Sequence, residues 1–417
     1  MTPEQKRVKY GCYAGNLSMS VVGNLSPLLF LTFRNLYGIS YSLLGLLVLI
    51  NFCTQLTVDL IFSFFSHKFN IGKTVKFTPV LTAVGLTVFA LSPYIFPGAV
   101  YVGLVIGTVL FSASSGLSEV LLSPVIAALP AKDPDREMSK LHSIYAWGVV
   151  GMVIFSTLFI FLLGESNWMW LTLIFTAVPI SSLILYRGVE IPKMETPEKA
   201  SGAIIFLKNR GVWLCVFAIF LGGAAECIMA QWCSGYLEAA LSIPKIWGDI
   251  FGVALFSLTL GVGRSMYAKY GKNIYPVLFT CAVGAAACYF TAAVSSIPLL
   301  GLAACALTGL FTSMLWPGNL IAATDRYPSG GVLIYALMAA GGDFGASVGP
   351  QLVGIVTDWA IASERIGEIA LGMGITAEQL GMKLGMLIGM LFPLIAIAVF
   401  AVMWRSKVKR TRKVDAD

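Results

Sequence analysis

Long apolar stretches alternate with short polar segments along the whole chain. A helix needs about 20 mostly apolar residues to cross a hydrocarbon core of about 30 Å, and twelve stretches meet this requirement. They lie near residues 10–33, 40–65, 75–95, 99–128, 141–164, 168–187, 211–237, 247–268, 274–294, 297–323, 331–357 and 383–404. The pattern predicts an all-α polytopic membrane protein with twelve transmembrane helices. We expect breaks in these helices at Pro27, Pro124, Pro317 and Pro350.

Composition supports this fold class and narrows the chemistry. Only 12% of the residues are charged and 57% are hydrophobic, whereas a soluble chain has about 25% charged residues. The chain has 2 histidines, and its 8 cysteines form no Cys-x-x-Cys pair. We therefore expect neither a metal site nor a cofactor, and no structural disulfide. The first apolar stretch is long and lacks a small-residue cleavage site, so we do not expect a signal peptide.

The basic residues orient the predicted helices. If the N-terminus is cytoplasmic, 24 of the 28 lysines and arginines fall on the cytoplasmic side, as the positive-inside rule requires. The four on the outer side are Arg34, Lys245, Arg365 and Lys383. The net charge of +7 is spread over short loops without aromatic interleaving, which argues against nucleic-acid binding. We expect a multi-pass protein of the cytoplasmic membrane with both termini cytoplasmic.

Two longer polar segments interrupt the pattern. Residues 188–210 are polar and contain prolines, so they are expected to link an N-terminal six-helix bundle, residues 1–187, to a C-terminal one, residues 211–404. Residues 405–417 form a basic cytoplasmic tail. On the outer side, residues 358–382 are expected to include a short amphipathic helix.

A short pattern recurs in the two halves. Lysine, an aromatic residue, glycine and lysine follow the second apolar stretch as Lys68, Phe69, Gly72 and Lys73, and they follow the eighth as Lys269, Tyr270, Gly271 and Lys272. A tight glycine turn between basic residues suits a cytoplasmic hairpin that connects two helices. Its symmetric placement indicates an internal repeat.

Twelve stretches, a central linker and the repeated hairpin resemble the major facilitator superfamily, in which two pseudo-symmetric six-helix bundles rock around a central site. Several motifs are similar to the fucose–proton symporter branch of that superfamily. They are Glu119-x-x-x-Ser123-Pro124, then Gly309-x-x-x-Ser313-x-x-Trp316-Pro317, and the series Gly341-Gly342, Pro350, Gly354 and Asp358. The resemblance implies alternating access, with gating residues at the cytoplasmic hairpins. These are Asp59, Lys68, Gly72, Lys73, Arg264, Lys269, Gly271 and Lys272.

Three acidic residues stand near the middle of predicted helices: Glu119, Glu226 and Asp343. An ionisable group at this depth costs about 2.5–3.5 kcal/mol and usually faces a cavity. The sequence places no lysine or arginine in the middle of any span to neutralise them. A carboxyl group in a low-dielectric site can be loaded with a proton and unloaded near neutral pH, which proton coupling requires.

The resemblance makes Glu119 the first choice for the coupling residue. The fucose-type scheme also uses an aspartate in the first helix, which here has only Asn16 and Asn24 as strongly polar residues. Glu226 and Asp343 are therefore the alternatives. Each also has a structural interpretation, since Glu226 could bond a neighbouring helix and Asp343 could bond exposed backbone at a close helix crossing.

Polar and aromatic residues near the expected central cavity are candidates for solute binding. Aromatic rings with amides and carboxylates suit a neutral polyhydroxy ligand, whose apolar faces stack while its hydroxyls donate and accept. His142 could relay protons, or it could lie at the membrane interface. The candidates are Asn24, Ser115, Glu119, His142, Tyr145, Trp147, Glu226, Gln231, Trp232 and Trp316.

These observations favour a secondary transporter that acts as a monomer on a small polar solute, most simply a sugar, with a proton as the coupling ion. Proton-driven efflux of amphipathic compounds is the alternative within that class, since 26 phenylalanines and 15 methionines could line an apolar pocket. A solute sensor or a membrane-embedded enzyme is the alternative of another class. An enzyme is not expected, because neither histidine is placed for a catalytic cluster. The sequence leaves sodium coupling open.

Overall fold

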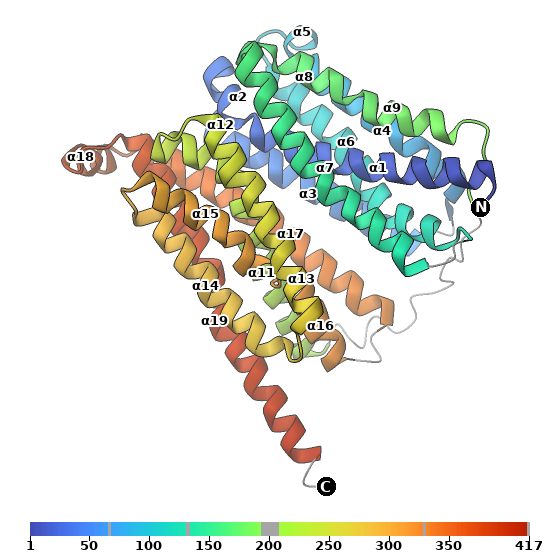
Figure 1. Ribbon diagram of the computed structural model, residues 1–417. Coiled ribbons are helices and arrows are strands. Elements are labelled where there is room, and N and C mark those ends of the chain that lie inside the picture. The colour runs from blue at the N-terminus through green and yellow to red at the C-terminus, as the bar shows by residue number, and fades with distance from the viewer. Residues whose placement is uncertain (66–67, 131–133, 193–207, 328–330, 415–417) are drawn as a thin grey trace. The chain divides into compact units, whose positions relative to one another are not determined.

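Helices make up every regular element of the computed structural model (Figure 1). The structure describes residues 1–417 except 66–67, 131–133, 193–207, 328–330 and 415–417. In the first half the helices are α1 (Pro3–Leu28), α2 (Phe30–Tyr37), α3 (Tyr41–Phe65), α4 (Ile71–Ala90), α5 (Ser92–Ile95), α6 (Val100–Ala127), α7 (Pro134–Leu163), the 3-10 helix η2 (Glu165–Asn167), α8 (Trp168–Phe175) and α9 (Ala177–Tyr186).

The second half begins after the segment expected to be a linker, most of which lies outside the described residues. Its helices are α11 (Arg210–Leu241), α12 (Lys245–Trp247), the π-helix η3 (Gly248–Ala254), α13 (Leu255–Tyr270), α14 (Ile274–Val294), α15 (Pro298–Thr312), α16 (Pro317–Arg326), α17 (Gly331–Ala362), α18 (Glu364–Gly372) and α19 (Ala377–Val414). The predicted outer surface segment, residues 358–382, contains α18.

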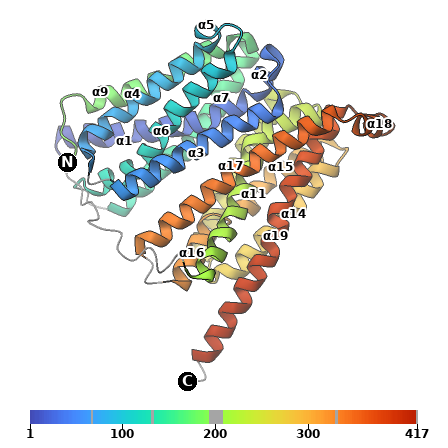
Figure 2. The same cartoon turned by 180° about the vertical axis from the view of Figure 1, so that it is seen from behind.

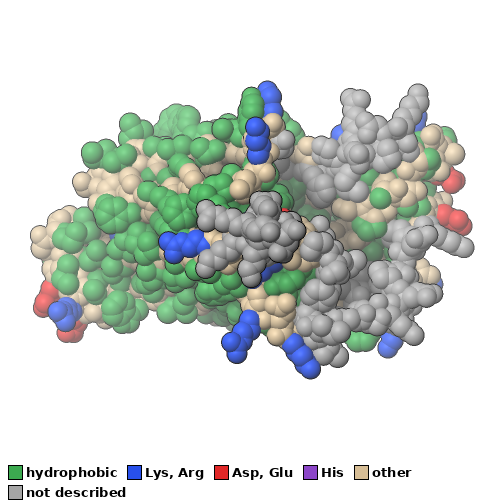
Figure 3. Space-filling model, turned by 90° about the horizontal axis from the view of Figure 1, so that it is seen from below, with side chains coloured by type: hydrophobic (Ala, Val, Ile, Leu, Met, Phe, Trp, Pro, Cys, Tyr) green, Lys and Arg blue, Asp and Glu red, His purple; other side chains and the backbone are tan. Residues whose placement is uncertain are grey.

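The prediction of a polytopic membrane protein is confirmed. Within the described residues, 9 helices are long and apolar enough to cross a membrane, and α1 with α2, bent by 46° at their junction, would make a tenth. The remaining predicted stretches, near 75–95 and 331–357, coincide with α4 and α17. Large apolar side chains stay exposed on the long helices, for example Leu162 of α7 at 73% and Leu299 of α15 at 74%. Figure 3 shows one such face, with broad hydrophobic areas and few charged side chains.

Two of the four expected proline breaks are present. Helix α1 ends one residue after Pro27, and Pro317 begins α16 after a turn that separates it from α15. Proline has no N–H to donate, so it is well tolerated in the first turn of a helix. The other two expectations are wrong, because α6 continues through Pro124 and α17 continues through Pro350. Neighbouring helices can satisfy the backbone carbonyl that an internal proline leaves free.

The contacts of the chain divide it into two compact units. Unit 1 contains residues Met1–Ile39 and Leu47–Ala200, and unit 2 contains Ser40–Leu46 and Ser201–Asp417. The division after Ala200 falls inside the expected linker, whereas the placement of Ser40–Leu46 with unit 2 was not expected. In unit 2, α14 and α19 lie side by side, and the end of α19 extends beyond its neighbours (Figures 1 and 2).

The first turn of α3 is bonded into unit 2 by acidic side chains. The carboxylate of Asp358, on α17, accepts hydrogen bonds from the backbone N–H groups of Tyr41 at 3.0 Å and Ser42 at 2.6 Å. The Tyr41 hydroxyl donates to Glu378, at the start of α19, over 2.8 Å. A negative charge at a helix N-terminus satisfies otherwise free N–H groups and is favoured by the helix dipole. Asp358 therefore acts as an N-cap supplied by another helix.

Candidate functional site

An ion pair lies between two membrane-spanning helices of unit 2. Arg264, on α13, places Nη2 3.0 Å from Oε1 of Glu226, on α11. The same guanidinium donates from Nε to the backbone carbonyl of Ser313 over 3.1 Å. This carbonyl is accessible because it belongs to the turn between α15 and α16. Three spans thus meet at one arginine.

This ion pair corrects the expectation that no basic residue neutralises the acids within the spans. The sequence pattern placed Arg264 on the cytoplasmic side as a gating residue. In the structure it lies inside α13, six residues before the helix ends at Tyr270, which corresponds to about 9 Å along the helix axis. Its long side chain reaches Glu226 from there, and for Glu226 the expectation of an unpaired carboxylate is wrong.

The Trp316 ring packs against one glycine of α11 and one glycine of α17. A Cβ atom built on Gly342 would lie 2.5 Å from Cη2 of Trp316, and one built on Gly223 would lie 3.1 Å from its Cζ3. The glycines therefore leave the space that the indole fills. Because Gly342 precedes Asp343 and Gly223 is one helical turn from Glu226, the aromatic ring lies close to the backbone that carries both acids.

Helices α11 and α17 cross at very close range in this region. A Cβ atom on Gly345 would lie 2.0 Å from the backbone oxygen of Phe220, which no real side chain could do. Asp343 is half-buried on α17, and the Cys227 thiol is within electrostatic reach of Asp343, Glu226 and Arg264. The close crossing expected around Asp343 is confirmed. Whether Asp343 titrates or holds the backbone stays open.

In unit 1, Glu119 has a different environment. It lies on α6, eight residues before the helix ends at Ala127, or about 12 Å from that end. Its side chain is exposed, while its neighbours Ser115 and Ser118 are buried at 5% and 4% exposure. Among the described residues no hydrogen bond or ion pair to the Glu119 carboxylate is present. Glu119 thus faces space that the protein does not fill.

A polar seam between α3 and α6 was missed by the sequence interpretation. Asn51 accepts hydrogen bonds at Oδ1 from Gln55 Nε2 over 3.1 Å and from Ser112 Oγ over 2.6 Å. One turn further along α3, Asp59 faces α6, because a Cβ on Gly116 would lie 3.0 Å from its Oδ1. The signal was the spacing of Asn51, Gln55 and Asp59, each four residues apart on one face of an apolar helix.

Comparison with known proteins identifies the family of this chain. The profile of the Major Facilitator Superfamily matches residues 12–350. The chain belongs to this superfamily. Members of the superfamily are membrane transporters of small solutes, so the expected fold and the transporter class are confirmed. Comparison with curated protein sequences gives no match.

Several solved transporter structures share the fold. A bacterial homologue of the human lysosomal transporter Spinster is 12% identical, with 98% of each chain covered and a TM-score of 0.72. The nucleoside transporter NupG is 13% identical, with 97% of this chain and 99% of that chain covered and a TM-score of 0.70. The Escherichia coli fucose–proton symporter is 14% identical, with 93% and 98% covered and a TM-score of 0.56. Similarity at this level shows the fold and does not distinguish a branch.

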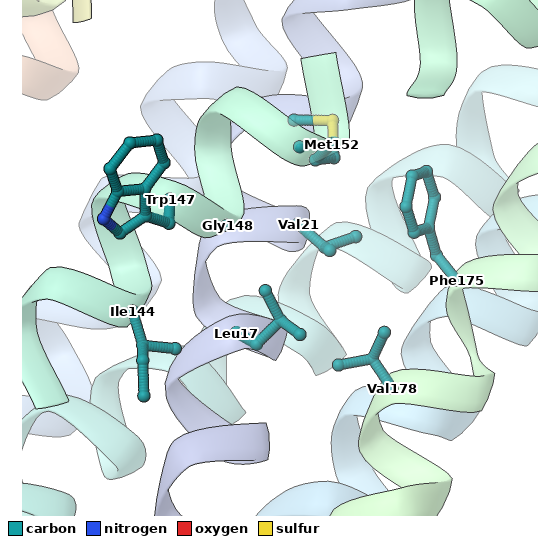
Figure 4. Close-up of a pocket in the computed structure, with 9 residues that line it drawn as sticks. Leu17, Val21, Ile144, Trp147, Gly148, Met152, Phe175 and Val178 are labelled. Atoms are coloured by element: carbon teal, nitrogen blue, oxygen red, sulfur yellow. The ribbon is translucent and has the colours of Figure 1, made fainter. Parts of the chain in front are cut away.

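The structure does not bring every aromatic candidate into a polar site of this major facilitator protein. The Trp147 side chain is 73% exposed and lines a hollow of about 350 Å³ with Leu17, Val21 and Phe175 (Figure 4). The described lining of this hollow is apolar, so it offers a polyhydroxy ligand no hydrogen bonds. The contribution of Trp147 to a solute site stays a prediction. Tyr145 is 39% exposed, and the His142 side chain lies outside the described residues.

Trp232 is part of the packed interior of unit 2. It is fully buried, donates from Nε1 to the backbone oxygen of Pro350 over 2.9 Å, and packs against the Tyr41 ring at 5.8 Å. Its indole therefore binds the carbonyl region around a helix-internal proline and is not available to a solute. Gln231 is also buried, at 6% exposure, and Asn24 donates to the carbonyl of Ser20 in its own helix.

A second ionic network of unit 2 was also missed. Asp249 is fully buried in the π-helix η3 and accepts a hydrogen bond from Ser234. Lys245 Nζ lies 3.4 Å from Asp249 Oδ2 and 3.1 Å from Ser234 Oγ, and its side chain is only 15% exposed. Lys245 is therefore more than an outer topology signal. A buried carboxylate needs such partners to offset its desolvation.

The two hairpins that were expected on the cytoplasmic side place their lysines on the surface but do not form tight glycine turns. Gly72 lies in the first turn of α4, and Gly271 has a φ of −67°, so neither requires glycine for a left-handed conformation. Lys68 lies over the Phe65 ring at 5.1 Å, and Lys269 lies over the Tyr270 ring at 5.1 Å. The gating role of Asp59, Lys73 and Lys272 stays a prediction.

Proposed function

We propose that this major facilitator protein is a proton-coupled secondary transporter for a sugar or a related small polar metabolite, working as a monomer in the cytoplasmic membrane with both termini inside. The transporter would alternate between outward and inward access to its solute. The observation that carries the proposal is the Glu119 carboxylate, which is exposed inside a membrane-spanning helix and bonded to no described residue.

Glu119 suits the role of proton carrier because of its exposure and its lack of partners. A carboxylate that faced lipid would cost about 2.5–3.5 kcal/mol, so its exposed position within α6 indicates access to a water-filled cavity. No described cation holds it in the charged form. It can therefore exchange a proton with water during the transport cycle.

Glu226 suits solute binding because it belongs to an ion pair that is open on the arginine side. Arg264 Nη2 lies 3.0 Å from Glu226 Oε1. The Arg264 side chain remains 44% exposed, so it can still donate hydrogen bonds to hydroxyl groups of a ligand. The nearby Trp316 ring would stack on an apolar sugar face. Asp343 is the remaining acid of this region and an alternative proton carrier.

The proposed substrate class is supported by solved transporters that share the fold. Solved relatives include a D-xylose–proton symporter and a fucose–proton symporter, and the nucleoside transporter NupG acts on molecules that also carry a sugar ring. Hydroxyl groups are the feature common to these substrates. The combination of Arg264, Glu226 and Trp316 fits such ligands, because it offers donors, acceptors and a stacking surface.

The test uses purified protein in liposomes and a panel of radiolabelled pentoses, hexoses and nucleosides. We expect an imposed inward proton gradient to drive accumulation of at least one of these solutes by the wild type. Glu119→Gln should abolish this accumulation and retain counterflow exchange, since exchange needs no net proton movement. The matched control is Glu137→Gln, which removes an acid outside the spans and should retain accumulation.

Full gradient-driven accumulation by Glu119→Gln would remove Glu119 from the coupling step. The same experiment with Asp343→Asn then decides whether the second acid carries the proton. If no solute of the panel accumulates under a proton or a sodium gradient, the proposed substrate class is contradicted.

A further inference from the structure

A hollow of about 530 Å³ lies in unit 1 at the cytoplasmic hairpin between α3 and α4. Val58 and Ile61 of α3 form one wall, and Phe77 of α4 forms the opposite wall. Leu117 of α6 and Phe69 of the hairpin complete the apolar part. The hollow is separate from Glu119, which does not line it, so an occupant need not be the transported solute.

The apolar walls are unusually exposed for side chains near a helix end. Phe77 is 52% exposed, Ile61 is 45% exposed and Phe69 is 44% exposed. These three residues lie on three successive segments of the chain and face one hollow. Protein packing does not cover them, so an acyl chain can pack against this surface by van der Waals contact.

The polar part of the lining is confined to one end. Lys73 and Thr74 belong to the first turn of α4, while Phe77 lies one turn further into the helix, or about 6 Å away. The Lys73 side chain is exposed, and Lys68 and Lys76 lie on the same hairpin. The Asn70 side chain caps this helix end by accepting from the Lys73 backbone N–H over 3.0 Å. The hollow thus has a cationic mouth and an apolar interior.

This combination matches an anionic amphiphile that lies with its charge at the cytoplasmic membrane surface. The positive-inside distribution of the chain assigns the hairpin to that surface. Anionic phospholipids of the inner leaflet carry a phosphate at this level, and basic residues beside a membrane helix attract them. A free phosphate would use the cation but leave the apolar walls uncovered.

We propose that this hollow is a binding site for one anionic glycerophospholipid of the inner leaflet. The lipid phosphate lies at Lys73, and one acyl chain covers Ile61, Phe77 and Leu117. The site contains neither Glu119 nor the Arg264–Glu226 ion pair, so lipid binding can be measured without knowledge of the solute or of the coupling residue.

Native mass spectrometry of the detergent-purified full chain tests the site. Dioleoylphosphatidylglycerol and dioleoylphosphatidylcholine are titrated separately, and the first bound lipid is quantified. We expect the wild type to bind phosphatidylglycerol more tightly than phosphatidylcholine. Lys73→Gln should reduce this preference roughly fivefold, which corresponds to the contribution of one basic side chain to binding at an anionic membrane surface. Lys73→Arg should retain it. The matched control is Lys272→Gln, which removes the corresponding lysine of the second hairpin and should have no effect.

Two further arms separate the lipid from other occupants. Leu117→Trp fills the hollow and should weaken binding of phosphatidylglycerol, with correct folding checked by the melting temperature. Glycerol 3-phosphate, which has the headgroup without acyl chains, should compete only weakly. The proposal is overturned if Lys73→Gln keeps the wild-type preference, if both lipids bind equally to the wild type, or if glycerol 3-phosphate binds as tightly as the lipid.

Discussion

Arg264 Nη2 and Glu226 Oε1 lie 3.0 Å apart, so a basic residue near the end of α13 compensates an acid in the interior of α11. The acid is 17% exposed and the arginine 44% exposed, which leaves the pair open on the arginine side. The pair is therefore accessible from the arginine side, and it links α13 to α11.

Removing one partner of this pair should cost more than removing both. A fully buried pair loses about 3–5 kcal/mol when one partner is removed, and because Arg264 is half-exposed we expect about 1–3 kcal/mol for Arg264→Gln. The double variant Arg264→Gln/Glu226→Gln should be more stable than Arg264→Gln alone, since it leaves no uncompensated carboxylate. Melting temperatures in one detergent, combined as a double-mutant cycle, measure the coupling. Additive effects would show that the two side chains do not interact.

A methyl group at Gly345 should be destabilising, because its Cβ would lie 2.0 Å from the Phe220 backbone oxygen and would force α11 and α17 apart. We expect Gly345→Ala to lose about 1–3 kcal/mol, as overpacking usually does. Gly367→Ala is the matched control. Nothing lies within 4 Å of a Cβ at Gly367 in α18, so the better helix propensity of alanine should leave stability unchanged or raise it slightly. Equal melting temperatures for both variants would contradict the close crossing.

The Asp358 cap of α3 should contribute measurably to the stability of unit 2. Asp358→Ala removes the acceptor of the Tyr41 and Ser42 N–H groups, and we expect a loss of about 1 kcal/mol, with Asp358→Asn intermediate. Hydrogen exchange of the first turn of α3 is the specific measurement, and it should speed up in both variants. Glu364→Gln removes an exposed acid nearby and serves as the control. Unchanged exchange in Asp358→Ala would mean that the cap is not formed in solution.

Glu137 should make the stability of unit 1 depend on pH in the acid range. Hydrogen bonds from Lys140 and Tyr13, together with the nearby Lys9 ammonium, lower the pKa of the Glu137 carboxyl from 4.5 to about 2. A carboxyl with a lowered pKa stabilises the folded state above its unfolded pKa, and this contribution is lost as the pH falls toward the folded pKa.

The wild type should therefore melt at a higher temperature than Glu137→Gln at pH 7. The difference should shrink between about pH 5 and pH 2, and it corresponds to at most about 1 kcal/mol because the exposed Lys140 is screened by solvent. Melting curves of both proteins at several pH values give the comparison. A difference that stayed constant down to pH 3 would assign the effect of the substitution to packing.

The positions of the long apolar helices could be predicted from hydropathy alone. An apolar stretch of about 20 residues can satisfy its backbone in lipid only as a helix, so each stretch reports its own structure without knowledge of its neighbours. The position of Glu119 inside the long helix α6 was also predictable, because depth along one helix does not depend on its neighbours. The effect of prolines inside these helices was harder to predict. Pro124 and Pro350 continue their helices, since the packing of adjacent helices decides whether the freed carbonyl is satisfied.

Contacts between side chains of different helices could not be predicted from the sequence. Arg264 and Glu226 are 38 residues apart, and only the tertiary arrangement of α11, α13 and α15, the last of which contacts both others, brings them together. The same holds for Trp232, which hydropathy could not distinguish from a ligand-stacking residue but which donates to Pro350 in the packed interior. The sequence by itself determined the membrane helices, because hydrophobicity acts on each segment separately. The tertiary structure decided which acids are paired, since an ionic contact depends on the distance between two helices.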